Sequence, residues 1–66
     1  MFLEVGDRLL VTDRNGQGSS HVCRVVSAWG LDGAPPYLVL RYDTGTEEIL
    51  VPNPDLRIRV LTHAQV

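Results

Sequence analysis

The residues able to bind a metal are a histidine and a cysteine two positions apart. His21 and Cys23 share a face if this stretch is a strand, so both side chains would reach one ion. A closed zinc site needs four ligands, and the only other histidine of the chain is His63. We therefore expect no metal site, and we interpret Cys23 as a small buried thiol beside a histidine at the end of a loop.

Residue types used in catalysis occur without the partners that catalysis needs. Ser19 and His21, with Asp13 nearby, offer a nucleophile and a base, but the surrounding loop supplies no oxyanion scaffold. Glu47 and Glu48 are adjacent on a predicted strand and point to opposite faces, so they cannot act as a paired acid and base. The sequence predicts no catalytic residue, no cofactor and no enzymatic activity.

Binding is the class of function that the aromatic residues favour. The predicted ligand or partner surface combines rings and guanidinium groups from the middle of the chain: Trp29, Tyr37, Tyr42, Arg24 and Arg41. Such groups stack on nucleic-acid bases or on a peptide. The alternative interpretation is that Tyr37 and Tyr42 close the two ends of a small core.

The elements that position these residues centre on a hairpin. Residues 37–43 and 46–51 are rich in β-branched and aromatic side chains, and Gly45 between them tolerates positive φ. Pro35-Pro36 and Pro52 limit the two strands, because proline cannot donate a hydrogen bond to a ladder. The remaining strands are predicted over residues 8–12, 21–28 and 56–61, with a loop over residues 13–20.

Five short strands predict an all-β fold, and their layout favours a five-stranded SH3-like small barrel. Pro52-Asn53-Pro54-Asp55 is too short for an α-helix and predicts one 3-10 turn before the last strand. An oligonucleotide-binding barrel is the alternative, but it needs a helix where this chain has only Thr44-Gly45. We expect one domain over residues 1–66, with frayed ends at residues 1–5 and 62–66.

Alternation with a period of two predicts which side chains fill the interior. The predicted core consists of aliphatic residues from all five strands: Leu9, Val11, Val25, Val39, Ile49 and Ile58. Four leucines fall on the opposite face of their strands: Leu10, Leu40, Leu50 and Leu61. These leucines predict an apolar patch through which the chain self-associates or docks on a partner.

The composition is that of a small soluble globular protein. The chain has 66 residues, of which 44% are hydrophobic and 21% charged, and no apolar run is long enough to cross a bilayer. The net charge of -2 disfavours a protein whose affinity depends mainly on phosphate contacts. A single cysteine excludes an intramolecular disulfide, and the first residues lack a signal-peptide pattern, so we expect a cytoplasmic protein without a membrane partner.

A pattern that spans the chain from Gly6 to about Ile58 consists of five pieces: Gly6-Asp7-Arg8-Leu9, Asp32-Gly33-Ala34-Pro35-Pro36-Tyr37-Leu38-Val39, Arg41-Tyr42-Asp43-Thr44-Gly45, Glu47 and Pro52-Asn53-Pro54-Asp55. The pattern resembles an uncharacterised family of small actinobacterial proteins, which has a Gly-Asp start, an Asp-Gly-x-Pro-Pro-Tyr segment, an Arg-Trp-x-Asp-Gly-His-Glu hairpin and a Pro-Gly-Pro-Asp corner. The chain differs at Tyr42, Thr46 and Asn53, where the family has Trp, His and Gly, and it has an extra residue such as Leu40 in the third strand. The resemblance implies a small β-barrel and assigns no activity.

Two functions follow from these observations. The favoured one is a non-catalytic protein-interaction or self-association module. The alternative is a nucleic-acid-binding small barrel that uses Trp29, Arg41 and Tyr42.

Overall fold

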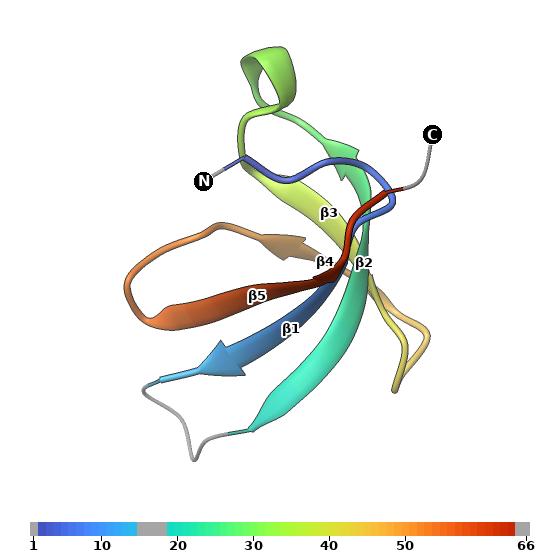
Figure 1. The fold of residues 1–66 in the computed structure, drawn as a ribbon, viewed down its shortest axis with the longest axis vertical. Helices are drawn as coiled ribbons and strands as arrows, with labels where there is room; N and C mark the ends of the chain where they lie inside the picture. The colour runs from blue at the N-terminus through green and yellow to red at the C-terminus, as the bar shows by residue number, and fades with distance from the viewer. Residues whose placement is uncertain (1, 15–18, 65–66) are drawn as a thin grey trace.

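The computed structural model describes residues 2–14 and 19–64, and in this part of the chain it has five strands and one short 3-10 turn. The strands are β1 (Arg8–Asp13), β2 (Ser20–Ala28), β3 (Tyr37–Arg41), β4 (Glu47–Leu50) and β5 (Leu56–Thr62), and the 3-10 turn is η1 (Leu31–Gly33). All pairings are antiparallel, and the strands form one curved sheet in the order β4-β3-β2-β1-β5 (Figure 1). The prediction of an all-β fold is confirmed. The sheet is not closed, because no pairing between described residues joins β4 to β5.

The core lies on the concave face of the sheet. Its fully buried side chains come mainly from alternate positions of β1, β2 and β3, as a period of two requires. Burial of one such aliphatic or aromatic side chain contributes about 1.5–3 kcal/mol to folding. The core predictions for Leu9, Val11, Val25 and Val39 are confirmed, while Ile58 is half-buried and packs against the others.

In β4 the predicted alternation is wrong by one residue. The sequence predicts Ile49 in the core and Leu50 on the outside, but Leu50 is 6% exposed and Ile49 is 48% exposed. The register explains the difference, because Leu50 lies opposite the buried Tyr37 and Ile49 lies opposite Leu38 on the outer face. Ile49 and Leu50 are both apolar and adjacent at the end of a four-residue strand, so the periodicity of the sequence does not determine which of them faces the core.

The predicted hairpin is present, with shorter strands than the composition indicates. The strand β3 ends at Arg41, and the Arg41 N–H donates to the carbonyl of Thr46 over 2.9 Å. The Gly45 N–H donates back to the Arg41 carbonyl over 2.9 Å, and Gly45 has a φ of 71°. A glycine therefore supplies the left-handed residue that this four-residue turn requires.

The sequence predicts the 3-10 turn before β5, but the structure has it before β3. At the predicted place, the Leu56 N–H donates to the Asn53 carbonyl over 3.0 Å and closes a single turn. The prolines at positions 52 and 54 have no N–H to extend it. In η1, Asp32 and Gly33 both have positive φ, 56° and 83°, and the Ala34 N–H donates to the Leu31 carbonyl. Positive φ at both central residues is the pattern of a type I′ turn, for which Asp-Gly is a preferred pair.

Within the described residues, segments near both chain ends make hydrogen bonds to residues distant in the sequence. Leu3 is buried, and its N–H donates to the Tyr37 hydroxyl over 2.8 Å. Thr62 belongs to β5, and the Ala64 N–H donates to Asp7 over 2.7 Å. Residues 1 and 65–66 lie outside the described part of the chain, and so do residues 15–18 of the predicted loop.

Candidate functional site

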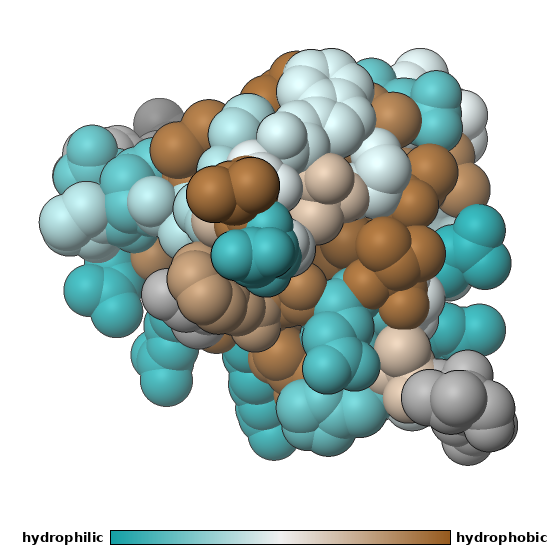
Figure 2. Space-filling model, turned by 90° about the horizontal axis from the view of Figure 1, so that it is seen from above, coloured by the Kyte–Doolittle hydropathy of each residue, from teal (hydrophilic) through white to brown (hydrophobic). Residues whose placement is uncertain are grey.

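Exposed apolar side chains gather at one end of the molecule. The segment that leads into β1, the turn η1 and the C-terminal end of β5 meet there (Figure 1). Four large apolar residues of these segments are exposed, and we call them the apolar end: Phe2 at 72%, Val5 at 56%, Trp29 at 58% and Leu31 at 85%. Figure 2 looks onto this end and shows several apolar side chains interspersed with polar and weakly polar ones.

The tyrosine beneath the apolar end joins the two segments that carry it. Tyr37 is fully buried, and its hydroxyl accepts a hydrogen bond from the Leu3 N–H and donates one to the Gly33 carbonyl over 3.1 Å. The lead-in and the turn η1 are thus held to the same phenol oxygen. The backbones next to Phe2 and Leu31 are therefore linked through Tyr37, while both side chains are exposed.

A buried carboxylate ties the same end to the last residues of the described chain. Asp7 is 3% exposed, and its two oxygens accept from the N–H groups of Glu4, over 3.0 Å, and Ala64, over 2.7 Å. The Asp7 carbonyl accepts from the Val25 N–H of β2. One aspartate therefore connects the lead-in, β2 and the end of the chain.

Close packing of the backbone positions Trp29 and Leu31. A Cβ atom on Gly30 would lie 2.3 Å from the Pro35 carbonyl oxygen, so only glycine fits between the two arms of this connection. The Trp29 N–H donates to the Pro36 carbonyl, and its indole N–H donates to the Ser27 hydroxyl over 2.9 Å. The indole thus has a fixed orientation while more than half of its surface faces solvent.

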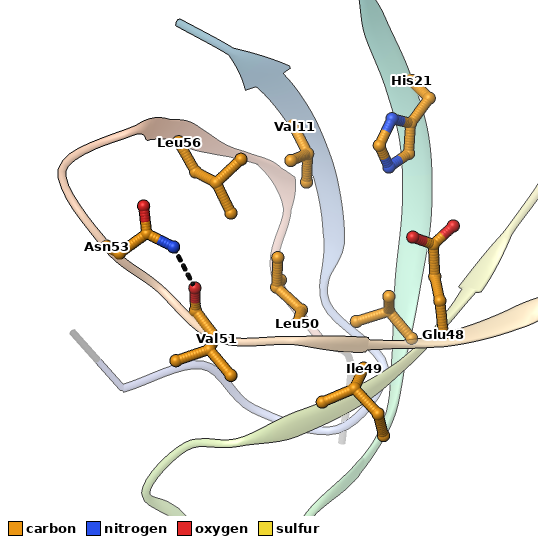
Figure 3. A pocket seen from close by; sticks show the side chains of 9 residues that line it. Val11, His21, Glu48, Ile49, Leu50, Val51, Asn53 and Leu56 are labelled. Carbon is orange, nitrogen blue, oxygen red and sulfur yellow. Dashed lines mark hydrogen bonds between the residues drawn. The ribbon is translucent and has the colours of Figure 1, made fainter. Parts of the chain in front are cut away.

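A shallow hollow lies between β4 and the start of β5, where the sheet is open. It has a volume of about 290 Å³, and its lining combines core and rim residues: Val11, His21, Val39, Glu48, Ile49, Leu50, Val51, Asn53 and Leu56. Figure 3 shows Val11, Leu50 and Leu56 pointing into it, Ile49 and Val51 pointing away, and His21 and Glu48 facing each other at one side. The hollow is the uncovered end of the core, with only two titratable side chains.

The charged residues next to this hollow neutralise one another. Arg41 contacts Asp43 at 2.7 Å and Glu48 at 3.4 Å. The hydrogen bond between Arg41 and Asp43 lowers the pKa of Asp43 and raises the pKa of Arg41. The predicted role of Arg41 in binding a ligand conflicts with this pairing, because an incoming anion would have to displace two carboxylates.

The thiol of Cys23 is an inert part of the core. Burial, with a smaller contribution from the charge of Glu48, raises the pKa of Cys23 to about 11. Among the described residues no group of three or more His, Cys, Asp or Glu side chains is placed to hold a metal ion. The geometry thus assigns Cys23 to packing.

The raised pKa of Cys23 predicts a loss of stability in alkali. The folded protein keeps the thiol proton up to about pH 11, whereas the unfolded chain loses it near pH 8.5. The contribution of the protonated Cys23 thiol to the free energy of unfolding is complete below pH 8.5 and is lost as the pH rises towards 11. In urea titrations across this range, we expect the difference in unfolding free energy between wild type and Cys23→Ala to narrow as the pH rises. A constant difference would contradict the assignment.

The predicted ligand-binding residues do not form one surface. Trp29 is exposed at the apolar end, and Tyr37 is buried beneath it, so Tyr37 is a core residue and not a surface one. Tyr42 is exposed after β3, and the Arg8 guanidinium carbon lies 5.6 Å from the centre of its ring. Arg24 is exposed on the outer face of β2.

The predicted leucine patch is also divided. Leu50 is in the core, which removes it from any surface. Leu10 and Leu40 are half-buried on the outer face, and Leu61 is exposed near the end of β5. Sequence reasoning missed the exposure of Phe2, Val5 and Leu31. A signal existed for Leu31, because it directly precedes Asp32-Gly33, a pair that places the preceding residue at the base of a tight turn.

These features define a small all-β domain with one curved antiparallel sheet and an apolar end. Residues 1–58 match a family described as a domain of unknown function (DUF1918), and the chain belongs to this family. The predicted resemblance to an uncharacterised family of small domains is thus confirmed. Searches of curated proteins and of solved structures found no match. In the described residues no helix has the length and apolarity needed to cross a membrane.

Proposed function

We propose that this chain is a non-catalytic protein-interaction module that binds a partner protein through the apolar end. The observation that supports the proposal is the exposure of Phe2, Val5, Trp29 and Leu31 on segments held by the Tyr37 and Asp7 hydrogen bonds. Exposed apolar side chains that gather on one surface are typical of protein-binding sites, and a rigid support lowers the entropy lost on binding.

The charges at the apolar end favour a particular partner chemistry. Glu4 and Asp32 are exposed in the same segments as Phe2 and Leu31, so the apolar end has acidic side chains beside it in the sequence. A partner segment with an apolar centre and flanking Lys or Arg residues complements this surface. A second copy of the chain fits it less well, because it would bring like charges together.

A peptide-display experiment tests this proposal. A random peptide library is panned against the wild-type protein and against Phe2→Ser/Leu31→Ser, which changes two exposed side chains and leaves the core intact. We expect peptides with an apolar centre and basic flanks to be enriched on wild type and lost on the variant. Ile49→Ser, an exposed apolar position on β4, is the control and should retain the same peptides. Equal enrichment on wild type and the double variant would overturn the proposal.

Sedimentation equilibrium examines self-association as the competing mode. We expect a monomer over the accessible concentration range, since the predicted leucine patch loses Leu50 to the core. A dimer that Phe2→Ser/Leu31→Ser dissociates would identify a second copy as the occupant of the apolar end. A dimer that the variant leaves intact would place self-association on another surface. The proposed partner chemistry would then be contradicted if the wild-type protein also enriched no peptide with an apolar centre and basic flanks.

We also infer that the curved sheet is an SH3-like barrel open between β4 and β5. The strand order β4-β3-β2-β1-β5 and the position of both edge strands beside one hollow support this architecture. Nuclear Overhauser contacts between β4 and β5 side chains across the hollow would support a barrel whose two edge strands approach each other without pairing, and their absence would argue for a sheet whose edges lie far apart. We further propose an actinobacterial origin, from the resemblance, and a cytoplasmic location, which the single buried cysteine fits.

A further inference from the structure

A second exposed surface lies on the outer face of β2, β1 and β5, away from the core. Four of the six arginines of the chain are exposed there, and we call them the arginine face: Arg8, Arg24, Arg57 and Arg59. The register brings them together, because Arg8 lies opposite Arg24, Arg57 opposite Thr12 and Arg59 opposite Leu10. Thr12, Leu10 and Arg8 alternate with the buried Leu9 and Val11, so their side chains share the outer face.

The arginine face has no internal neutralisation. In the part of the chain that the structure describes, the ion pairs between side chains both belong to Arg41, on β3. Arg8 and Arg24 lie directly opposite each other on neighbouring strands. Like charges in such positions destabilise a sheet. A bound polyanion would relieve this repulsion.

The arginine face contains a shallow hollow on the outer surface of the paired strands β1 and β5. Its volume is about 280 Å³, and it is lined by Leu10, Thr12, Arg57 and Arg59. The Thr12 hydroxyl is hydrogen-bonded to the Ser20 hydroxyl over 2.8 Å. The hollow therefore combines two guanidinium groups and a hydroxyl, which bind phosphate oxygens, with an apolar leucine on which a sugar or base can rest.

An aromatic ring borders the same surface. The guanidinium of Arg8 lies over the exposed ring of Tyr42, with 5.6 Å between its central carbon and the ring centre. Guanidinium planes and exposed aromatic rings are the groups on which the bases of single strands stack. An acidic protein segment has no planar bases and would use the arginines alone.

The net charge of -2 does not oppose this surface, because the one acidic residue of β1, β2 and β5 is Asp13, which alternates onto the face opposite the arginines. The carboxylate nearest along the outer face of the sheet is that of Glu47, separated from Arg24 by the intervening Leu40 of β3. Two strand spacings separate the backbones of Arg24 and Glu47 by roughly 10 Å. A ligand on β1 and β5 therefore experiences mainly the four arginines.

We propose that the arginine face binds single-stranded nucleic acid, with phosphates on Arg57, Arg59 and Arg24 and a base stacked on Tyr42 beside Arg8. This site differs from the apolar end and does not depend on it. It also differs from the nucleic-acid surface that the sequence predicted, because Trp29 and Arg41 have no part in it.

Fluorescence anisotropy with a labelled thymidine oligonucleotide of about twelve residues tests the proposal. Binding is expected at low salt, with a log–log salt slope of about -2.1 if the three arginines Arg24, Arg57 and Arg59 each neutralise one phosphate. Arg59→Gln should weaken binding and reduce the magnitude of this slope by about 0.7, whereas Arg41→Gln, with the same change in net charge, should leave both unchanged. The proposal is overturned if no binding occurs at low salt, or if the two variants weaken binding equally.

A second variant separates nucleic acid from other polyanions. Tyr42→Ala should weaken oligonucleotide binding about 5- to 150-fold by removing a stacked base, and should leave the binding of a polyglutamate peptide unchanged. An equal effect of Tyr42→Ala on both ligands, or tighter binding of polyglutamate than of the oligonucleotide, would show that the surface serves acidic proteins. Either result would contradict a nucleic-acid site.

Discussion

Asp7→Ala is expected to lower the free energy of unfolding by about 2–4 kcal/mol, because Asp7 is the one buried polar or charged residue among those that the structure describes. The carboxylate is buried and accepts from the N–H groups of Glu4 and Ala64. Its removal leaves two partly buried N–H donors without their charged acceptor. A domain of this size has few kcal/mol in reserve, so the variant should be partly unfolded at room temperature.

Urea denaturation followed by circular dichroism measures this effect. Asp55→Ala is the matched control, since Asp55 is exposed and its hydrogen bonds with Asn53 and Arg14 run through its backbone. The control should change the unfolding free energy by less than about 0.5 kcal/mol. Asp7→Asn should be intermediate, because an amide offers one acceptor oxygen where the carboxylate offers two. Equal stability of Asp7→Ala and Asp55→Ala would contradict the role assigned to the buried carboxylate.

Leu50→Ala is expected to cost about 2–5 kcal/mol, while Ile49→Ala, one residue earlier, should cost less than about 1 kcal/mol. Leu50 packs in the core opposite Tyr37, so its truncation leaves a cavity. Ile49 has about half of its surface in solvent, and surrounding water fills the space of the lost atoms.

The pair of variants is a direct test of the strand register. Both remove aliphatic atoms from the same four-residue strand, so differences in helix or strand propensity are small beside the difference in burial. Thermal unfolding monitored by circular dichroism gives the two midpoints under one set of conditions. If Ile49→Ala proved the more destabilising variant, the alternation predicted from the sequence would be right and the register of β4 would be wrong.

The sequence predicts the sheet well where alternation and turn chemistry agree. In β1 and β2 each of the core residues Leu9, Val11 and Val25 has a polar or charged neighbour on one side, which fixes the alternation, so these residues are assigned correctly. The β3–β4 hairpin follows from Gly45 for a similar local reason. In β4 the adjacent Ile49 and Leu50 are equally apolar, and only the pairing with β3 decides which is buried.

The surfaces could not be predicted to the same extent, because they depend on contacts between distant residues. Tyr37 was assigned to a binding surface because aromatic rings serve both roles. Its hydrogen bonds to Leu3 and Gly33 require knowledge of how the lead-in crosses the turn. The arginines at positions 8, 24, 57 and 59 are far apart in the sequence, and their common face appears only when β5 pairs with β1. The pairing of Arg41 with Asp43 and Glu48 likewise depends on the hairpin register.

The fluorescence of Trp29 tests the protein-binding role of the apolar end most directly. It is the single tryptophan of the chain and more than half of its surface is exposed, so its emission reports on this surface alone. On titration with a peptide enriched on the wild-type protein, we predict a shift of the emission to shorter wavelengths and weaker quenching by acrylamide. Peptides that bind by calorimetry yet leave the emission and the quenching of Trp29 unchanged would contradict the account.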